Sequence, residues 1–417
     1  MQTLFVNAAQ VVTCAGPGRA RRGAASGDAG VRTGHAVLIE GERITAVAPR
    51  DLLERAHPHA QRLDCHGGVL TPGLVDSHTH GIFGKPRYEE QELRASGLGY
   101  MEIANRGGGI HSSVRDLRTR TEDELVALAL PRLRRLAAHG TTTVELKSGY
   151  GLSVDAELLS LRVIRRLQEA LPMRIVPTFL GAHEIPLEFR TAPRHRQEYI
   201  DLLVHEMLPV VEAEGLARFA DIFCEPGVYT VEESRRILTA ARAHGLLIKL
   251  HADELQSGGA AELAADIGAT SADHLAAISD AGIAALAASA TVATLLPGTM
   301  LFLGRERQAP ARALLNAGAA IALATDFNPG SSPTPSIPMV MSLACTQMKM
   351  TPAEALTATT VNAAHALGLD STVGTLEVGK RADFAIHTCA DYREIAYFFG
   401  FNKARQVFAG GMVILNG

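Results

Sequence analysis

The sequence has no tryptophan, and aromatic residues occupy only 5% of its 417 positions. Its five cysteines are scattered and form no CxxC pair, which argues against a disulfide framework or a cysteine-based zinc site. No apolar run approaches the roughly 18 residues of a membrane-spanning helix. Lysine and arginine number 40 against 44 acidic residues, so we expect no nucleic-acid or membrane partner. A small-molecule substrate is the expected partner.

The first residues, MQTLFVNAAQVVTCAG, also lack the basic opening and long apolar core of a secretory signal, so we expect a cytoplasmic protein. Apolar residues make up 47% and charged residues 20% of the chain, which is typical of a folded globular protein. At about 150 residues per domain, this length allows two or three domains. One barrel of about 250 residues with a smaller partner fits equally well. Sixteen histidines are the unusual count.

From about Gly73, β-rich runs alternate with helical patterns at a spacing typical of βα units. Eight candidate strands cover residues 74–78, 141–145, 174–179, 220–224, 247–251, 271–274, 291–295 and 320–325. Helical patterns between them include residues 155–171, 231–244 and 259–267, and residues 351–367 are predicted to form the last helix. Eight such units predict an α/β fold, a (β/α)8 TIM barrel.

Both ends of the chain are strand-rich and lie outside this barrel. We predict that residues 1–70 and 370–417 jointly build a small composite β-sandwich, and that residues 71–369 form the barrel. The arginine cluster from Arg19 to Arg22 is interpreted as a solvated loop.

Candidate metal ligands fall at the carboxyl ends of the predicted strands, where the reactive groups of a TIM barrel gather. His78 and His80, in DSHTH, have an i, i+2 spacing that directs both imidazoles to one face. Further polar residues end other strands: His183, His251, Glu254, His274 and Asp326. Because strand ends converge, these residues predict a metal site, whereas an isolated His-x-His would not.

Longer stretches resemble the amidohydrolase superfamily through nearly the whole chain: TPGLVDSHTH, HGTTTVELKSGYG, LGAHEIP, KLHADE, SADHL, ATDFNPGS and GTLEVGKRADF. HTHGIFGKPR, RGGGI and ELKSGYGLS are similar to a narrower branch of that superfamily. The branch hydrolyses the cyclic amide of 4-imidazolone-5-propanoate to N-formimidoyl-L-glutamate in histidine degradation. The resemblance therefore implies a metal-dependent hydrolase of carbon–nitrogen bonds. It also implies that the protein is a homodimer.

The resemblance also implies which residues act. A single ion, zinc or iron, would be held by His78, His80, His251 and Asp326. Asp326 and His274 would orient the attacking water and accept its proton, and Glu254 would carry a proton to the leaving ring nitrogen. Substrate contacts are implied for Arg87, Tyr150, His183, Glu254, Asn328, Gly330 and Ser331.

Arg87 and Lys147 need separate interpretation. Arg87 can pair bidentately with the substrate carboxylate, which a lysine could not reproduce.

Many two-metal relatives use a carboxylated lysine on the fourth strand as a bridge between the metals, but Lys147 follows the second strand. We therefore interpret Lys147 as a structural or supporting residue.

Two other functions stay open. The same metal and proton-transfer set would serve another one-metal amidohydrolase, such as a cyclic-amidine or aminopyrimidine deaminase, although such a substrate gives Arg87 no evident use. A non-catalytic, amidohydrolase-like assembly protein is the alternative from a different class. The remaining histidines, including His387, are expected to have surface or helical positions.

Overall fold

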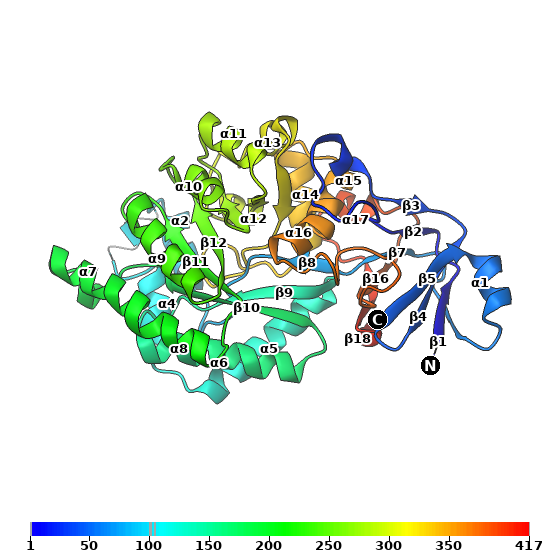
Figure 1. Ribbon diagram of the computed structural model, residues 1–417, viewed down its shortest axis with the longest axis horizontal. Helices are drawn as coiled ribbons and strands as arrows, with labels where there is room; N and C mark the ends of the chain where they lie inside the picture. The colour runs from blue at the N-terminus through cyan, green and yellow to red at the C-terminus, as the bar shows by residue number, and fades with distance from the viewer. Residues whose placement is uncertain (1, 100–101, 104–105, 417) are drawn as a thin grey trace.

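The computed structural model describes residues 2–99, 102–103 and 106–416. Eight parallel strands follow one another in sequence order around a barrel, with helices outside it (Figure 1). They are β8 (Leu74–Asp76), β9 (Thr141–Lys147), β10 (Arg174–Ala182), β11 (Phe219–Cys224), β12 (Leu247–Ala252), β13 (Ser271–His274), β14 (Val292–Leu295) and β15 (Ala320–Leu323). Each predicted strand lies on an observed one, so the predicted TIM barrel is confirmed.

The barrel helices begin at local signals in the sequence. At Thr121 and Thr230, capping boxes with Glu124 and Glu233 start two of the longer helices. Those between the barrel strands are α2 (Tyr88–Ala95), α4 (Ile110–Leu117), α5 (Glu122–Ala138), α6 (Val154–Ala170), α7 (Pro193–Leu202), α8 (Leu208–Ala213), α9 (Val231–Ala243), α10 (Ala260–Asp266), α11 (Asp280–Ala288), α12 (Pro297–Phe302) and α13 (Ala311–Ala317). After β15 come α14 (Ile337–Gln347), α15 (Pro352–Ala358) and α16 (Val361–Ala366).

The predicted single helix over residues 351–367 is wrong, because α15 ends and α16 begins around Thr359 and Thr360. Thr360 has φ −130° and ψ −92°, which lies outside the helical region. The break exposes the Thr359 carbonyl, which accepts a hydrogen bond of 2.8 Å from the Val75 amide at the first barrel strand. The hydrogen bond that joins this break to the first barrel strand therefore accounts for the interruption of the predicted helix.

At the opposite end, the first and last strands are joined through the predicted metal ligands. The Asp326 amide donates to the His78 carbonyl at 3.0 Å, and the His80 amide donates to the Phe327 carbonyl at 2.8 Å. The seam of the barrel thus fixes the backbone from which these ligands project.

The two ends of the chain build two further sheets beside the barrel (Figure 1). One has the order β5-β4-β1-β6 and the other β18-β17-β16-β7-β2-β3. Phe5, Phe384 and Phe408 pack in the core between them. The strands are β1 (Gln2–Val6), β2 (Gln10–Val12), β3 (Val31–Arg32), β4 (His35–Glu40), β5 (Arg43–Pro49), β6 (Gln61–Asp64), β7 (Val69–Pro72), β16 (Phe384–His387), β17 (Ala404–Ala409) and β18 (Met412–Asn416). The short helices of this region are α1 (Arg50–Ala56) and α17 (Glu394–Tyr397).

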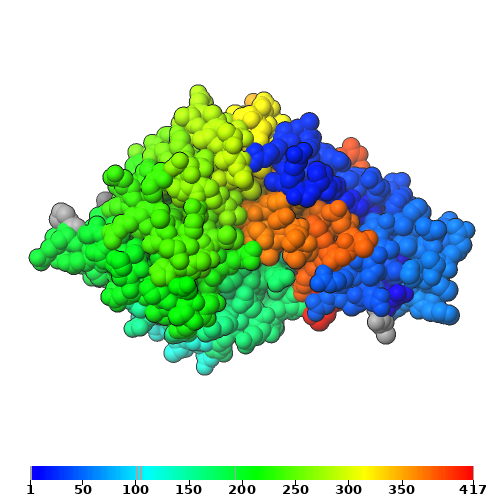
Figure 2. All heavy atoms as spheres, viewed as in Figure 1, coloured from blue at the N-terminus to red at the C-terminus, as the bar shows by residue number. Residues whose placement is uncertain are grey.

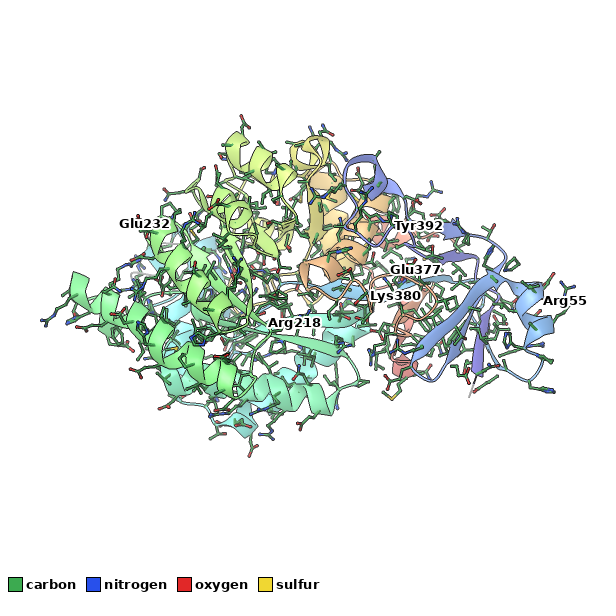
Figure 3. The ribbon with its side chains drawn as sticks, in the orientation of Figure 1. Arg55, Arg218, Glu232, Glu377, Lys380 and Tyr392 are labelled. Atoms are coloured by element: carbon green, nitrogen blue, oxygen red, sulfur yellow. The ribbon has the colours of Figure 1, made fainter. Side chains whose placement is uncertain are left out.

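The junction of barrel and sandwich contains Glu377 and Lys380 (Figure 3). Their charged groups lie 3.7 Å apart, and the Lys380 ammonium also donates to the Asp370 carbonyl at 2.7 Å.

Within the described ranges, no helix has the length and apolarity needed to cross a membrane.

One surface assignment was wrong in part and a second was wrong. Arg19 is exposed, as a solvated loop requires, but the residues up to Arg22 pack against later barrel helices (Figure 2). Arg21 is buried, and the Arg22 guanidinium donates to the carbonyls of Ala287 and Ser289, where α11 ends. His387 is fully buried in the sandwich, where its ring nitrogen Nε2 contacts the Thr71 hydroxyl at 3.0 Å.

Candidate metal centre and active site

The four predicted metal ligands converge at the mouth of the barrel. His80 Nε2 lies 3.2 Å from His78 Nε2 and 3.3 Å from His251 Nε2. Asp326 Oδ1 lies 3.4 Å from His80 Nε2 and 3.7 Å from His78 Nε2. A tetrahedral ion with ligand distances of about 2.0–2.1 Å separates its ligand atoms by about 3.3–3.4 Å. The four side chains therefore have the spacing of a coordination shell.

The chemistry of these donors also fits a metal ion. Burial lowers the pKa of His78 and of His80 well below the usual range, so both imidazoles are neutral and offer lone pairs. The His78 Nδ1–H donates to Asp273 at 2.6 Å, which leaves Nε2 as the ligand atom. Asp221 lies 3.0 Å from His251 Nδ1, so a carboxylate also faces the outer nitrogen of that ring.

Five charged side chains lie buried beneath the ligands: Glu145, Lys147, Asp221, Lys249 and Asp273. The Lys147 ammonium lies 2.7 Å from Asp221 and 2.9 Å from Glu145. The Lys249 ammonium lies 2.9 Å from Glu145 and 3.4 Å from Asp273. Every member therefore has an oppositely charged neighbour, as buried charges require. We call these five residues the buried ion network.

The ion pairs of Lys147 confirm its interpretation as a supporting residue. Burial alone would lower the pKa of its ammonium, but Asp221, Glu145 and Asp273 together raise it above the usual value. A charged ammonium acts as a cation beneath the metal ligands and does not bridge metals. Sequence reasoning missed the other four members of the network. Each is a charged residue inside a strand run, in TVELK, FADIFC, LIKLHA or SADH, but such a run does not identify the partner of the charge.

Glu254 and His274 lie side by side at the cavity. His274 Nδ1 is 3.6 Å from a Glu254 carboxylate oxygen. Burial raises the pKa of Glu254 well above its usual range, and Asp326 raises it further. Burial lowers the pKa of His274 well below its usual range. Burial thus favours the protonated form of the carboxyl and the neutral form of the imidazole, a combination that suits proton transfer.

Asp326 is held in an uncommon geometry. Its φ is +52°, in the left-handed region that is rare for residues other than glycine. The Thr299 hydroxyl donates to its Oδ2 at 2.6 Å, while Oδ1 faces the histidine ligands. Burial raises the pKa of Asp326 to about 6 despite this hydrogen bond. One oxygen is thus fixed by Thr299 and the other faces the ring nitrogens of His78 and His80.

The cavity beside these groups brings the predicted substrate residues together. It is lined by His80, Arg87, Ile110, Tyr150, His183, Phe223, His251, Glu254, Leu255, His274, Leu303, Asp326, Asn328 and Ser331. Of the predicted residues, only His78 and Gly330 are outside this lining. Ile110, Phe223, Leu255 and Leu303 were not predicted, because an apolar residue has no sequence signal that separates a cavity wall from ordinary packing.

Arg87 lines the cavity and is only 6% exposed. Its Nε forms an ion pair of 3.5 Å with Glu90, whereas Nη1 makes no hydrogen bond within the described part of the chain and remains available to a ligand. Gly330 permits this position, since a Cβ there would lie 1.5 Å from Arg87 Nη2. Gly330 therefore contributes by its lack of a side chain.

The other substrate candidates are fixed by their own loops. His183 Nδ1 contacts the Gly149 carbonyl at 2.9 Å, and the His183 ring stacks on His80 with centroids 5.0 Å apart. Burial lowers the pKa of His183 to about 3. Asn328 Oδ1 accepts the amide of Ser331 at 2.7 Å, which folds the turn after β15 towards the cavity.

Comparison with known proteins defines the class. The sequence model of the amidohydrolase family matches residues 69–414, so the chain belongs to the amidohydrolase family. Among its relatives, imidazolonepropionase of Geobacillus kaustophilus (strain HTA426) is 47% identical over 100% of this chain and 99% of its own. Imidazolonepropionase of Solibacter usitatus (strain Ellin6076) is 48% identical over 98% of both chains. Within the family, the chain belongs with the imidazolonepropionases, hydrolases that act on carbon–nitrogen bonds.

Solved structures support the fold. An adenosine deaminase from Xanthomonas campestris with bound zinc has a TM-score of 0.72 at 18% identity, covering 99% of this chain and 93% of its own. Guanine deaminase of E. coli has a TM-score of 0.74 at 15% identity, covering 100% of this chain and 99% of its own. At such identities the likeness establishes the architecture and leaves the substrate to the site.

Proposed function

We propose that the chain hydrolyses 4-imidazolone-5-propanoate to N-formimidoyl-L-glutamate, as its resemblance to imidazolonepropionases implies. The observation that carries the proposal is the position of Arg87 in the same cavity as three of the four predicted metal ligands, His80, His251 and Asp326. A buried guanidinium whose Nη1 has no hydrogen-bond partner in the described part of the chain suits the propanoate, while the predicted metal ligands serve the ring.

His78, His80, His251 and Asp326 hold one ion in this proposal, and the neutral imidazoles with one carboxylate suit zinc or iron. When bound, such an ion lowers the pKa of water and polarises the carbonyl under attack. The carboxylate of Asp326, with its Oδ2 fixed by Thr299, orients the attacking water and takes up its proton with His274. The neutral His274 ring donates a hydrogen bond to the substrate carbonyl oxygen.

Glu254 acts as the proton donor to the leaving ring nitrogen. Burial raises the pKa of this carboxyl and so favours its protonated form, and the carboxyl lies beside His274 at the cavity. Departure of an amide nitrogen without a proton would be slow. The hydrolysis therefore adds water across the ring C–N bond, with the hydroxyl on carbon and the proton on nitrogen.

Substrate position depends on the residues around the cavity. Arg87 pairs with the propanoate, and Tyr150, His183, Asn328 and Ser331 contact the ring or the carboxylate. Gly330 gives the Arg87 guanidinium its space.

The proposal is tested by the loss of imidazolonepropanoate absorbance, beside a panel of cyclic amides and aminopyrimidines. We expect hydrolysis of the imidazolone and none of the panel. Arg87→Met should raise KM at least about tenfold, because a hydrogen bond to a charged group contributes about 1.5–3 kcal/mol. Lys85→Met removes an exposed charge two residues away and is the matched control. An unchanged KM for Arg87→Met, or deamination of an aminopyrimidine, would favour a deaminase.

We further propose a homodimer in the cytoplasm. All five cysteines are free, which suits a reducing compartment. Tyr397, Phe399 and Phe401 are exposed apolar residues close together in sequence, and a second copy of the chain would cover them. Sedimentation of the purified protein tests the dimer, and a monomer at micromolar concentration would contradict it.

A further inference from the structure

Glu225 is a buried acidic residue outside the cavity lining. It follows β11 directly and is only 2% exposed. Its carboxylate reaches the loop after the neighbouring strand β12. Oε2 accepts the Glu254 amide at 3.0 Å, and Oε1 accepts the Gln256 amide at 2.7 Å. The Leu255 amide faces the same carboxylate. Three successive amides of the loop therefore converge on one side chain.

These hydrogen bonds fix the part of the loop that carries Glu254. β12 ends at Ala252, and the next residue, Asp253, turns the chain with a φ of +47°. The Asp253 carboxylate accepts the amides of Gly258 and Ala261 at 2.7 and 3.0 Å, so it holds the far end of the loop and the start of α10. Between these points the Glu254 backbone depends on Glu225.

Glu157 makes comparable hydrogen bonds at a different loop. Its fully buried carboxylate accepts the amides of Gly149, Gly151 and Leu152 at 2.8–3.1 Å. That loop carries Tyr150, which lines the cavity on the substrate side. The two glutamates thus have the same local chemistry but hold loops with different proposed roles, which makes Glu157 a matched comparison.

A buried carboxylate is costly unless hydrogen bonds compensate it, and a merely structural loop could be held by backbone hydrogen bonds alone. A proton donor must lie within hydrogen-bond reach of the atom that it serves, and a displacement of about 1 Å can lower the rate about 100-fold. We propose that Glu225 is a positioning residue, which sets the carboxyl of Glu254 against the leaving nitrogen through the loop backbone. This inference rests on the proposed role of Glu254.

The first test compares Glu225→Gln with Glu157→Gln. Glutamine keeps the shape but replaces one acceptor oxygen by an NH2 group that opposes a backbone N–H. For Glu225→Gln we expect kcat to fall about 10- to 100-fold, with KM and metal content unchanged. For Glu157→Gln we expect KM to rise more than kcat falls, because its loop carries a substrate contact. A kcat of Glu225→Gln within about twofold of the parent would overturn the proposal.

A double-mutant cycle separates positioning from general loss of structure. If Glu225 acts through Glu254, the variant with both Glu225→Gln and Glu254→Gln should be about as slow as Glu254→Gln alone. Multiplied losses, or loss of metal in step with activity, would overturn the proposal. If Glu225→Gln does not fold, Glu225→Asp replaces it in the cycle, because the shorter side chain can keep only one of the hydrogen bonds.

The same series distinguishes this inference from the function on which it rests. If Glu254→Gln keeps the parent kcat, the proposed role of Glu254 fails and the role of Glu225 fails with it. If Glu254→Gln is slow while Glu225→Gln is unaffected, only the positioning role of Glu225 fails.

Discussion

Beneath the metal ligands the barrel interior contains the five charged side chains of the buried ion network, whereas the sandwich interior contains three phenylalanine rings. Phe5 and Phe384 have centroids 4.7 Å apart, and Phe408 lies 5.1 Å from Phe5 and 4.7 Å from Phe384. Apolar packing of this kind stabilises a fold directly. Buried ion pairs contribute little net stability, because desolvation offsets their attraction.

The difference shows that the two interiors have different tasks. Asp221 and Asp273 contact the outer nitrogens of His251 and His78, and Lys147 and Lys249 neutralise these carboxylates from below. The barrel interior therefore orients the proposed metal ligands at the expense of apolar packing. The sandwich has no such demand, and it stabilises the joined ends of the chain. Changes to the two interiors should accordingly affect different measurements.

The largest effect is expected from loss of a metal ligand. His251→Ala removes one of the four converging donors, and metal activation contributes several kcal/mol to catalysis. We expect hydrolysis to fall at least about 1,000-fold, together with metal content. His244→Ala, at the end of α9 and away from the cavity, should change neither. Full activity of His251→Ala would show that hydrolysis does not require the four converging donor groups.

The converse effect is expected from the sandwich. Phe384→Ala should lower the free energy of unfolding by about 3–5 kcal/mol, because it removes a buried ring from the aromatic cluster. Urea denaturation measures this loss. The folded variant should keep its metal content and kcat. A proportional loss of metal would mean that the two interiors are coupled rather than separate.

A pH-dependent effect is expected at His387, which the sandwich buries. Burial lowers its pKa from 6.5 to about 4. Because the unfolded histidine binds a proton more readily, the stabilisation is complete above about pH 6.5 and is lost as the pH falls towards 4. At most about 3 kcal/mol is involved. His387→Gln should flatten the stability profile in this range, whereas His59→Gln, at an exposed position, should not. Identical profiles for the parent and His387→Gln would contradict the role of this burial.

The smallest effect is expected from the buried ion network. Asp273→Asn keeps an acceptor for His78 Nδ1 but removes the charge that faces Lys147 and Lys249. We expect metal affinity to fall about 10- to 100-fold, as is common for residues that orient metal ligands. Chelator competition measures this affinity. An unchanged metal affinity would show that the charge of Asp273 in the buried ion network does not support metal binding.

The barrel and the ligand positions could be predicted because both follow from local pattern. Strand-forming runs mark the strands, and the convergence of strand ends brings His78, His251 and Asp326 together. The ion network could not be predicted in the same way, because a lysine inside a strand looks the same whether it faces solvent or a buried carboxylate. Arg22 and His387 have partners 265 and 316 residues away, which no local pattern encodes.

The central claim is that the converging histidines and Asp326 hold an ion that the hydrolysis requires. Metal analysis of the purified protein, with imidazolonepropanoate hydrolysis followed before chelation, after it, and after the return of zinc or iron, tests this claim most directly. We predict one ion per chain, loss of activity with the ion and recovery on its return. Absence of a stoichiometric transition metal, with no gain of hydrolysis from zinc, iron or manganese, would contradict the account.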